Sequence, residues 1–332
     1  MSTTLPKILV TRKIPAAGLA CLDGKANYRI LRTQGVPSYD EVKAAVRGAD
    51  AILPLLTERI DGDILDNAPT VKVVANMAVG FDNVDVAAAT ARGVMVTNTP
   101  GVLTETTADF AWALLMAAAR RVVEGDRFTR DGRWKTWEPE GLLGQDLYGA
   151  TLGIIGFGRI GSAVARRAVG FDMDVIYYNP SPLKGEARQV AEDVGARSAD
   201  FEELMRESDF ISVHVPLTAD TRHLIGEGAL ALVKPTAVLV NTSRGPVVDP
   251  AALYQALSSG GLWAAALDVF EKEPVVPDDP LLSLPNLVVA PHLGSASVTT
   301  RNRMAVMAAE NALAALAGHR PPNLVNGDVW KG

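Results

Sequence analysis

Four histidines could deliver a proton near neutral pH, the task for which histidine is best suited. His292 follows the apolar residues 287–290 and a proline, and it precedes Leu-Gly-Ser. Open α/β sheets place their ligand-binding groups where strands end, so we expect His292 to be an acid/base catalyst. Structural roles are expected for His214, which lies in an apolar stretch, and for His223, which lies in a polar loop, whereas His319 is expected to be solvated in the tail.

An arginine and two glutamates follow other apolar stretches. Arg244 comes just after one such stretch, and its planar guanidinium could hold a carboxylate and polarise the adjacent carbonyl. The alternative is a surface arginine in a turn. Glu271 and Glu273 share a later loop, and either could pair with His292 and favour its protonated form. Spacing alone leaves the choice between them open.

A glycine-rich turn is the element that organises these groups. Gly156, Gly158 and Gly161 follow the apolar residues 152–155 with the spacing G-x-G-x-x-G, and an Ala-rich helical stretch comes next. The three glycines would permit a tight turn, the approach of a pyrophosphate and close helix packing, in that order. The start of the helix offers free N–H groups and a positive dipole. With a second strand at 175–178, the pattern predicts dinucleotide binding; an ordinary strand-to-helix turn is the alternative.

Short apolar stretches alternate with helical patterns, which predicts an α/β fold with parallel sheets. At 332 residues the chain is long for one core, so we expect two Rossmann-like or flavodoxin-like domains with the active site in the inter-domain cleft. A long buried helix is predicted from Thr104 to Val123. Further strands are expected at 7–11, 28–31, 51–56, 71–75, 94–97, 210–215, 237–240, 263–267 and 287–290, and a last helix at 300–316.

The composition argues against several classes of protein. The net charge is −6 and the basic residues are scattered, so no footprint for nucleic acid or an anionic membrane exists. No apolar stretch is long enough to span a bilayer. The single cysteine, Cys21, excludes an internal disulfide and a cysteine-based metal site. The first residues lack the pattern of a signal peptide. We expect a cytoplasmic protein that binds no metal, nucleic acid or membrane.

Four motifs in order make the sequence resemble the D-isomer-specific 2-hydroxyacid dehydrogenase family over nearly its whole length. They are GFGRIG at 156–161, NTSRG at 241–245, LDVFEKEP at 267–274 and PHLGS at 291–295. The resemblance implies that Arg244, Glu273 and His292 form the catalytic set. It therefore favours Glu273 over Glu271 as the partner of His292.

The resemblance also implies how the domains divide the work. Residues 1–99 with 296–332 would form the substrate-binding domain, and residues 100–295 the dinucleotide-binding domain. The sequence around Trp137 is similar to that of glyoxylate/hydroxypyruvate reductases, in which a matching tryptophan reaches the partner subunit's active site. The helix from Thr104 resembles the family's dimer-forming helix, so a homodimer is implied. Read alone, the aromatic residues could simply belong to a core.

A loop in the first domain matches the family's substrate-carboxylate segment. It reads Val79-Gly-Phe-Asp-Asn, and the backbone amides of Val79 and Gly80 would hold the carboxylate; a plain turn is the alternative. Leu53, Leu55 and Met77 are expected to line the substrate pocket. We therefore expect reduction of a small 2-keto acid, glyoxylate or hydroxypyruvate, to the D-2-hydroxy acid. The alternatives are a reductase of bulkier 2-keto acids and a dinucleotide-sensing, corepressor-like scaffold.

The end of the stretch 175–178 bears on the choice of cofactor. NAD-preferring folds place a carboxylate there against the ribose 2′-hydroxyl, but this chain has Asn179 and Ser181, which could donate to a 2′-phosphate. Lys184 and Arg188 lie within loop reach. NADP(H) is therefore favoured, with NAD(H) as the second choice. Further cofactor contacts are expected at Thr104, Gly156, Gly158, Arg159, Ile160, Gly161, Val215, Pro216, Thr221, Thr242, Asp268 and Gly294.

Overall fold

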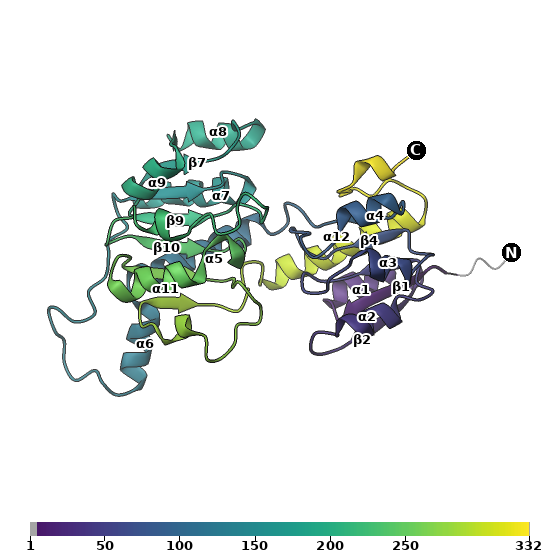
Figure 1. Ribbon diagram of the computed structural model, residues 1–332, viewed down its shortest axis with the longest axis horizontal. Coiled ribbons are helices and arrows are strands. Elements are labelled where there is room, and N and C mark those ends of the chain that lie inside the picture. Colours follow the sequence, from purple (N-terminus) through teal and green to yellow (C-terminus); the bar gives the residue numbers. More distant parts are fainter. Residues whose placement is uncertain (1–4, 332) are drawn as a thin grey trace. The chain divides into compact units, whose positions relative to one another are not determined.

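The computed structural model describes residues 5–331, which fold into two units (Figure 1). Of the described residues, unit 1 comprises 5–103 and 296–331, and unit 2 comprises Thr104–Ser295. The sequence placed these boundaries after residue 99 and before residue 296. Each unit contains its own parallel sheet, so the α/β fold with two parallel sheets is confirmed.

Unit 1 is built on a five-stranded sheet with the order β2-β1-β3-β4-β5. This is the flavodoxin-like order, and every pair in it is parallel. The strands are β1 (Lys7–Arg12), β2 (Asn27–Arg32), β3 (Ala51–Leu53), β4 (Val73–Ala75) and β5 (Met95–Thr97). The helices are α1 (Ala16–Leu22), α2 (Tyr39–Ala45), α3 (Gly62–Asp66), α4 (Val86–Ala91) and α12 (Val298–Leu316).

Helix α12 comes from the end of the chain but belongs to unit 1. It packs against α1 and against β3 and β4, and Figure 1 shows it in yellow beside the purple α1. The contact is close because Gly18 has no side chain: a Cβ there would lie 2.7 Å from Cβ of Ala305. Ser297 starts the helix by accepting a hydrogen bond from the Thr300 amide. The N-terminal sheet is thus covered by the C-terminal helix.

Unit 2 is built on a seven-stranded parallel sheet with the order β12-β11-β10-β9-β6-β7-β8. This is the Rossmann order with one more strand, and its switch point lies between β6 and β9. The strands are β6 (Thr151–Ile155), β7 (Asp174–Tyr178), β8 (Arg197–Ser198), β9 (Phe210–Val213), β10 (Val238–Asn241), β11 (Ala264–Leu267) and β12 (Leu287–Val289). The helices are α5 (Thr104–Ala119), α6 (Val122–Arg130), α7 (Arg159–Ala168), α8 (Gly185–Asp193), α9 (Phe201–Glu207), α10 (Glu227–Leu230) and α11 (Pro250–Ser259).

Both faces of the unit 2 sheet are buried. Ile154 belongs to a core cluster with residues of α5 and α7, whereas its neighbour Ile155 belongs to a second cluster with residues of α9, α10 and α11. Successive side chains of a strand point to opposite faces, so helices must cover both. This explains why the strands read as continuous apolar runs rather than as alternating patterns.

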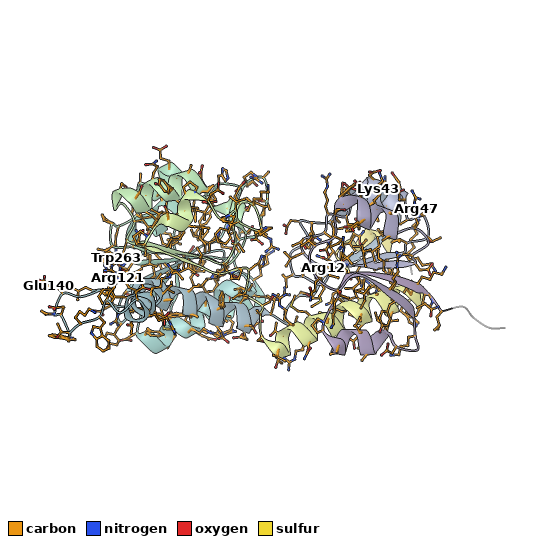
Figure 2. All side chains as sticks on the ribbon, turned by 90° about the horizontal axis from the view of Figure 1, so that it is seen from below. Arg12, Lys43, Arg47, Arg121, Glu140 and Trp263 are labelled. Carbon is orange, nitrogen blue, oxygen red and sulfur yellow. The ribbon has the colours of Figure 1, made fainter. Side chains whose placement is uncertain are left out.

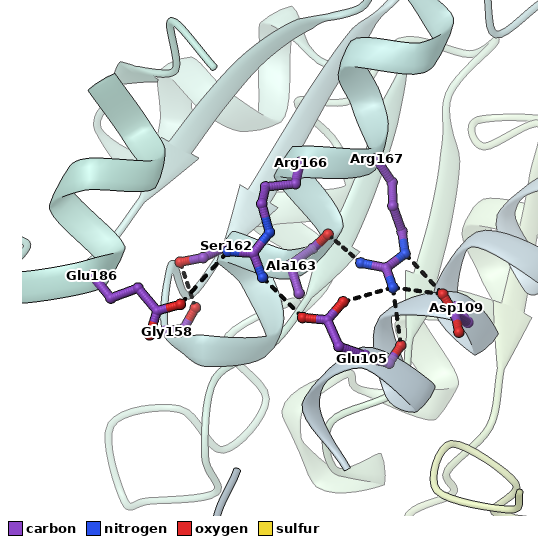
Figure 3. A network of polar contacts seen from close by, with 8 residues as sticks. All are labelled: Glu105, Asp109, Gly158, Ser162, Ala163, Arg166, Arg167 and Glu186. Carbon is purple, nitrogen blue, oxygen red and sulfur yellow. Dashed lines mark hydrogen bonds and ion pairs between the residues drawn. The ribbon is translucent and has the colours of Figure 1, made fainter. Parts of the chain in front are cut away.

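Helices α5 and α7 are joined by an ion-pair network at their surface (Figure 3). Glu105, in the first turn of α5, accepts from Arg166 at 2.9 Å and from Arg167 at 2.8 Å. Arg167 also contacts Asp109 at 2.6 Å, and Arg166 lies 3.7 Å from Glu186 of α8. The network therefore connects the start of α5 to the helix that follows the glycine turn.

The prediction of one helix from Thr104 to Val123 is wrong. Helix α5 ends at Ala119, and α6 begins after Arg121, whose φ of 52° is left-handed. The loop that returns to α5 explains the break, because the Gln145 amide donates to the Ala119 carbonyl at 2.9 Å and so satisfies the helix end. Arg121 lies between α5 and α6, and Glu140 lies far out on the loop that follows α6 (Figure 2). Within residues 5–331, no helix has the length and apolar character needed to cross a bilayer.

Candidate active site

Three neighbouring strands of unit 2 bring the predicted catalytic residues to one edge. Strands β10, β11 and β12 are adjacent and parallel, so their carboxyl ends meet. Arg244 follows β10, Glu273 follows β11 and His292 follows β12. The carboxyl edge of an open α/β sheet is also where ligands bind. The candidate site is built outward from this edge.

His292 and Glu273 form a direct pair. Nδ1 of His292 lies 2.7 Å from Oε2 of Glu273, and both side chains are 26% exposed. An ionised carboxylate only accepts hydrogen bonds, so the Nδ1–H donates and Nε2 is left for proton exchange with a ligand. The backbone amide of Phe270 donates to the other carboxylate oxygen at 3.1 Å. Glu273 therefore fixes both the tautomer and the orientation of the imidazole.

The electrostatics keep Glu273 ionised. Burial alone would raise the pKa of Glu273, but the hydrogen bond and charge of His292, the Phe270 amide and the charge of Arg244 lower it overall. The charge of Arg244 is the smallest of these effects. The three residues thus form one electrostatic group, in which the carboxylate interacts with an imidazole and with a guanidinium cation.

Asp268 holds the loop that carries His292. Its carbonyl accepts from the His292 amide at 2.9 Å, and its carboxylate accepts from the amides of Leu293 at 2.6 Å and Gly294 at 2.7 Å. Burial raises the pKa of Asp268, and the two amides partly offset this. Asp268 is 1% exposed and positions the histidine loop, and the cofactor contact indicated by the sequence stays a prediction. A Cβ on Gly294 would lie 3.4 Å from Thr107, so this loop also packs on α5.

Asn241 and Gly245 shape the turn that presents Arg244. The Asn241 side chain donates to the Arg244 carbonyl at 2.9 Å and accepts from the Ser243 amide at 3.0 Å. A Cβ on Gly245 would lie 1.8 Å from the Phe270 carbonyl, so only glycine fits there. The turn after β10 and the loop after β11 are therefore in backbone contact. The sequence motif contained both residues, but their positioning roles were not predicted.

The other histidines lie apart from this group. Nε2 of His214 is 2.8 Å from the Ser212 hydroxyl, and burial lowers the pKa of His214 to about 3, which fits the predicted core role. His223 contacts Glu271 instead of the catalytic pair, at 3.2 Å. His319 is exposed. Among residues 5–331 no group of His, Cys, Asp or Glu could hold a metal ion.

The glycine turn between β6 and α7 fits a dinucleotide pyrophosphate. Gly156 has a φ of 93°, and a Cβ there would lie 2.8 Å from the His214 carbonyl. A Cβ on Gly161 would lie 2.2 Å from the Gly156 carbonyl oxygen, so glycine is required for the helix to pack here. By contrast, the space around Gly158, the residue before α7, is open. The turn therefore combines a cradle with the free amides of a helix start.

A second feature that fits a ligand is Thr242, which follows β10. Its hydroxyl is buried and has no hydrogen-bond partner among the described residues. Buried polar groups are normally satisfied, so this hydroxyl indicates a missing partner. Thr221 differs, because its hydroxyl donates to the Pro216 carbonyl at 2.6 Å and so folds the loop after β9. Of the remaining predicted contacts, Thr104 begins α5, Arg159 and Ile160 begin α7, and Val215 is buried after β9.

The loop after β7 departs from the expected donor pattern. The Asn179 side chain accepts from the Phe157 amide at 3.2 Å and donates to the Ser181 carbonyl at 2.6 Å. Both of its polar atoms thus bind the protein itself and tie the glycine turn to the end of β7. Ser181 is exposed. No carboxylate stands at this strand end, as the sequence indicated.

In unit 1, the buried Asn76 and the partly buried Asn98 shape the loop after β4. Asn76 donates to the Gly80 carbonyl at 2.9 Å, and Asn98 donates to the Val79 carbonyl at 2.8 Å. The carbonyl oxygens of both predicted residues are thereby fixed within the loop. Sequence reasoning missed these asparagines, although a short amide directly after an apolar strand was a signal. Leu53 is wholly buried in β3, and its contact with a substrate stays a prediction.

Trp137 lies in the irregular loop between α6 and β6. It is 78% exposed, and Trp134 in the same loop is 62% exposed. Neither ring is part of a core, so the alternative of buried aromatic residues is excluded for these two. Large exposed aromatic rings are typical of surfaces that bind another molecule.

Comparison with known proteins agrees with this geometry. Residues 112–294 match the D-isomer specific 2-hydroxyacid dehydrogenase NAD binding domain. The glyoxylate reductase of Korarchaeum cryptofilum is 54% identical over 327 residues, which cover 98% of this chain and 97% of that protein. The glyoxylate reductase of Aeropyrum pernix is 51% identical over 330 residues, with the same two coverages.

Solved structures show the same fold. A Thermus thermophilus protein is 46% identical with a TM-score of 0.89, covering 96% of this chain and 99% of that one. An NADPH-dependent glyoxylate/hydroxypyruvate reductase from Sinorhizobium meliloti, solved with NADP and malonate, is 35% identical with a TM-score of 0.84 and covers 97% of both chains. The chain therefore belongs to the D-isomer specific 2-hydroxyacid dehydrogenases, a family of nicotinamide-dependent oxidoreductases.

Proposed function

We propose that this protein reduces glyoxylate or hydroxypyruvate to the D-2-hydroxy acid. The observation that carries the proposal is the pair of His292 and Glu273 beside Arg244, on the same sheet edge as the glycine turn. Relatives about half identical in sequence are glyoxylate reductases. Malonate bound to the Sinorhizobium meliloti enzyme supports a site for small carboxylates.

The residues of unit 2 would bind the cofactor and exchange the proton. The amides around Gly158 and the start of α7, with the Thr242 hydroxyl, would hold a nicotinamide dinucleotide, which supplies a hydride when bound. His292 then protonates the carbonyl oxygen of the substrate from Nε2, because Glu273 holds Nδ1. Glu273 remains ionised and stabilises the imidazolium before transfer.

The substrate carboxylate would be held by charge and by backbone donors. Arg244 offers a planar fork that can bind a carboxylate and polarise the neighbouring carbonyl. The amides of Val79 and Gly80 in unit 1 would complete the grip, as in the family segment that this loop matches. On this reading unit 1 binds substrate and unit 2 binds the dinucleotide.

The preferred cofactor in this proposal is NADP(H), with NAD(H) also used. The end of β7 carries Asn179 in place of a carboxylate, so a 2′-phosphate meets no repulsion there. Asn179 would contribute through the loop that it shapes, and Ser181, Lys184 and Arg188 remain the candidate donors. The NADP-bound relative from Sinorhizobium meliloti supports the same preference.

The protein would act as a homodimer in the cytoplasm. The exposed rings of Trp134 and Trp137 are suited to contact a second subunit. The matching tryptophan of related reductases reaches the partner's active site, which supports a place for Trp137 in the substrate pocket of the other subunit. One cysteine in the chain suits a reducing compartment.

A panel of 2-keto acids, each assayed with NADPH and NADH, tests the proposal. The highest kcat/KM is expected for glyoxylate or hydroxypyruvate with NADPH, and a lower value with NADH. A preference for phenylpyruvate would replace the proposed substrate with a bulkier keto acid. Dinucleotide binding without oxidation of NADPH by any keto acid would instead indicate a sensing scaffold.

A further inference from the structure

Glu271 lies two residues before the catalytic glutamate, yet it takes no part in the catalytic group. Its two carboxylate oxygens are bound separately by residues of the loop after β9. Nη1 of Arg222 contacts Oε1 at 2.8 Å, and Nε2 of His223 lies 3.2 Å from Oε2. The carboxylate that sequence spacing could not distinguish from Glu273 therefore has its own defined pair of partners.

The backbone of His223 reaches a third loop. Its amide donates to the Pro246 carbonyl at 2.7 Å, and its φ of 51° is left-handed. Gly245 is in backbone contact with Phe270, because a Cβ on Gly245 would lie 1.8 Å from the Phe270 carbonyl. The loops that follow β9, β10 and β11 therefore interlock. His223 contacts Pro246, in the turn after Arg244, and Glu271, in the loop of Glu273.

The loop of Glu271 is not closely packed throughout, because Glu271 and Lys272 both line a cavity. A cavity of about 260 Å³ lies there, lined in part by Val248, Leu253, Phe270, Val275 and Val276. Close packing is what normally fixes a segment in one position, and a cavity removes those contacts. The polar contacts of Glu271 with Arg222 and His223 therefore supply restraint that close packing does not give here.

We propose that Arg222, His223 and Glu271 form a positioning clamp that holds the loop of Glu273 and so sets the Glu273–His292 geometry. The clamp acts through Glu273 and touches no reacting atom, and its effect on turnover rests on the proposed function. Arg222 is 52% exposed, His223 39% and Glu271 36%. Exposed ion pairs add little to global stability, so the effect belongs to local geometry rather than to folding.

The variant Glu271→Gln removes the charge and keeps the shape. We expect kcat with glyoxylate to fall about ten-fold, because small displacements of catalytic groups are costly, while the Kd for NADPH stays within about two-fold. The melting temperature should stay within about 3 °C of the wild type. Glu202→Gln is the matched control, since Glu202 pairs with Arg206 on the exposed surface of α9 and should change none of these values.

The conservative variant of Arg222 gives a rescue test. Arg222 contacts Glu271 through one nitrogen, which a lysine can replace. We therefore expect Arg222→Lys to keep kcat within about two-fold of the wild type, whereas Arg222→Gln should resemble Glu271→Gln. Equal loss in both Arg222 variants would contradict a clamp that acts through charge.

The pH profile separates positioning from simple electrostatics. Removing the negative charge of Glu271 would by itself lower the pKa of Glu273 further. Loosening the interactions of Glu273 with His292 and Arg244 would instead raise the pKa of Glu273. Asp268 is a further charged group that interacts with Glu273. The clamp therefore predicts that the acid limb of kcat moves to higher pH in Glu271→Gln. A shift to lower pH would overturn it.

Imidazole NMR of the ligand-free protein tests the clamp independently of turnover. The chain has four histidines, so the Nδ1–H signal of His292 can be assigned with a His292→Gln variant. We expect this signal to weaken or broaden in Glu271→Gln and to stay unchanged in Glu202→Gln. An unchanged signal in Glu271→Gln would overturn the clamp even if the wild type reduces no keto acid. If the wild type is inactive but the signal changes in Glu271→Gln, the clamp is supported and only the proposed function is refuted.

Discussion

The backbone of His292 adopts a conformation that few non-glycine residues accept. Its φ is 57°, in the left-handed region. Three hydrogen bonds from the loop to Asp268 hold it there, and each comes from a backbone amide of residues 292–294. Strained conformations persist where surrounding contacts fix them, and they are frequent at functional sites. The strain at His292 thus agrees with its proposed role as the acid.

We expect His292→Gln to lower kcat by on the order of 10²–10⁴-fold, because the variant keeps the size of the side chain but has no acid to transfer a proton. The Kd for NADPH, measured by fluorescence, should stay near the wild-type value because the glycine turn is untouched. His319→Gln is the control, since His319 is exposed and distant in sequence from every site loop. Turnover at the wild-type rate in His292→Gln would remove His292 from the mechanism.

Some site residues could be predicted from their position after a strand, and others could not. Arg244 and His292 follow strongly apolar strands, so their location at the sheet edge could be read from the pattern. The choice of Glu273 over Glu271 depended on the family resemblance, because both lie in one irregular loop. The role of Asp268 in holding residues 292–294 could not be predicted, since a strand-end carboxylate can face a ligand or accept from backbone amides, and the sequence does not distinguish the two.

At the level of elements, strands were easier to predict than their ends. Strand β3 stops at Leu53, whereas the apolar pattern continued to residue 56, because Pro54 cannot donate to the ladder. Strand β8 has two exposed residues and gave no apolar signal. The break between α5 and α6 depends on a tertiary contact, in which the Gln145 amide donates to the Ala119 carbonyl at the end of α5. The local sequence therefore did not predict the break.

The α5–α7 network makes a prediction about stability and pH. Hydrogen bonds and charges from Arg167 and Arg166 lower the pKa of Glu105 in the folded protein. Its contribution to stability is therefore full above the ordinary glutamate pKa and is lost as the pH falls through the lowered value. We expect Glu105→Gln to lower the unfolding free energy at pH 7 by under about 1 kcal/mol, because the Glu105 side chain is 59% exposed.

Thermal unfolding at pH 7 and at about pH 3.5 measures this contribution. The difference between wild type and Glu105→Gln should shrink at the lower pH. Glu186→Gln is the matched control from the same network (Figure 3), because Glu186 lies 3.7 Å from Arg166 and is 79% exposed. A difference that stays constant or grows in acid would show that the carboxylate charge of Glu105 is not what stabilises the contact.

At the level of the whole molecule, the alternation of strands and helices was sufficient for the fold class but not for the strand order. In both sheets the strand order reverses beside the first strand, β1 or β6. The sequence contains no local signal for the side of that strand on which the next strand is added. Assembly is harder still to predict, because it depends on which side chains remain exposed. The rings of Trp134 and Trp137 could belong to a core or to an interface until their exposure was known.

The proposed homodimer makes the last prediction. If Trp137 completes the partner's substrate pocket, Trp137→Ala should raise the KM for glyoxylate about ten-fold, as loss of a buried aromatic contact does at interfaces, while the Kd for NADPH changes little. Light scattering should still report a dimer, since one ring is a small part of such an interface. Trp134→Ala is the control from the same loop, because its ring is also exposed but has no assigned place in the pocket. A monomeric wild type with full activity would contradict the assignment. Equal rises in the KM for glyoxylate in Trp137→Ala and Trp134→Ala would also contradict it, because the effect would then come from the loop as a whole rather than from one ring in the partner's site.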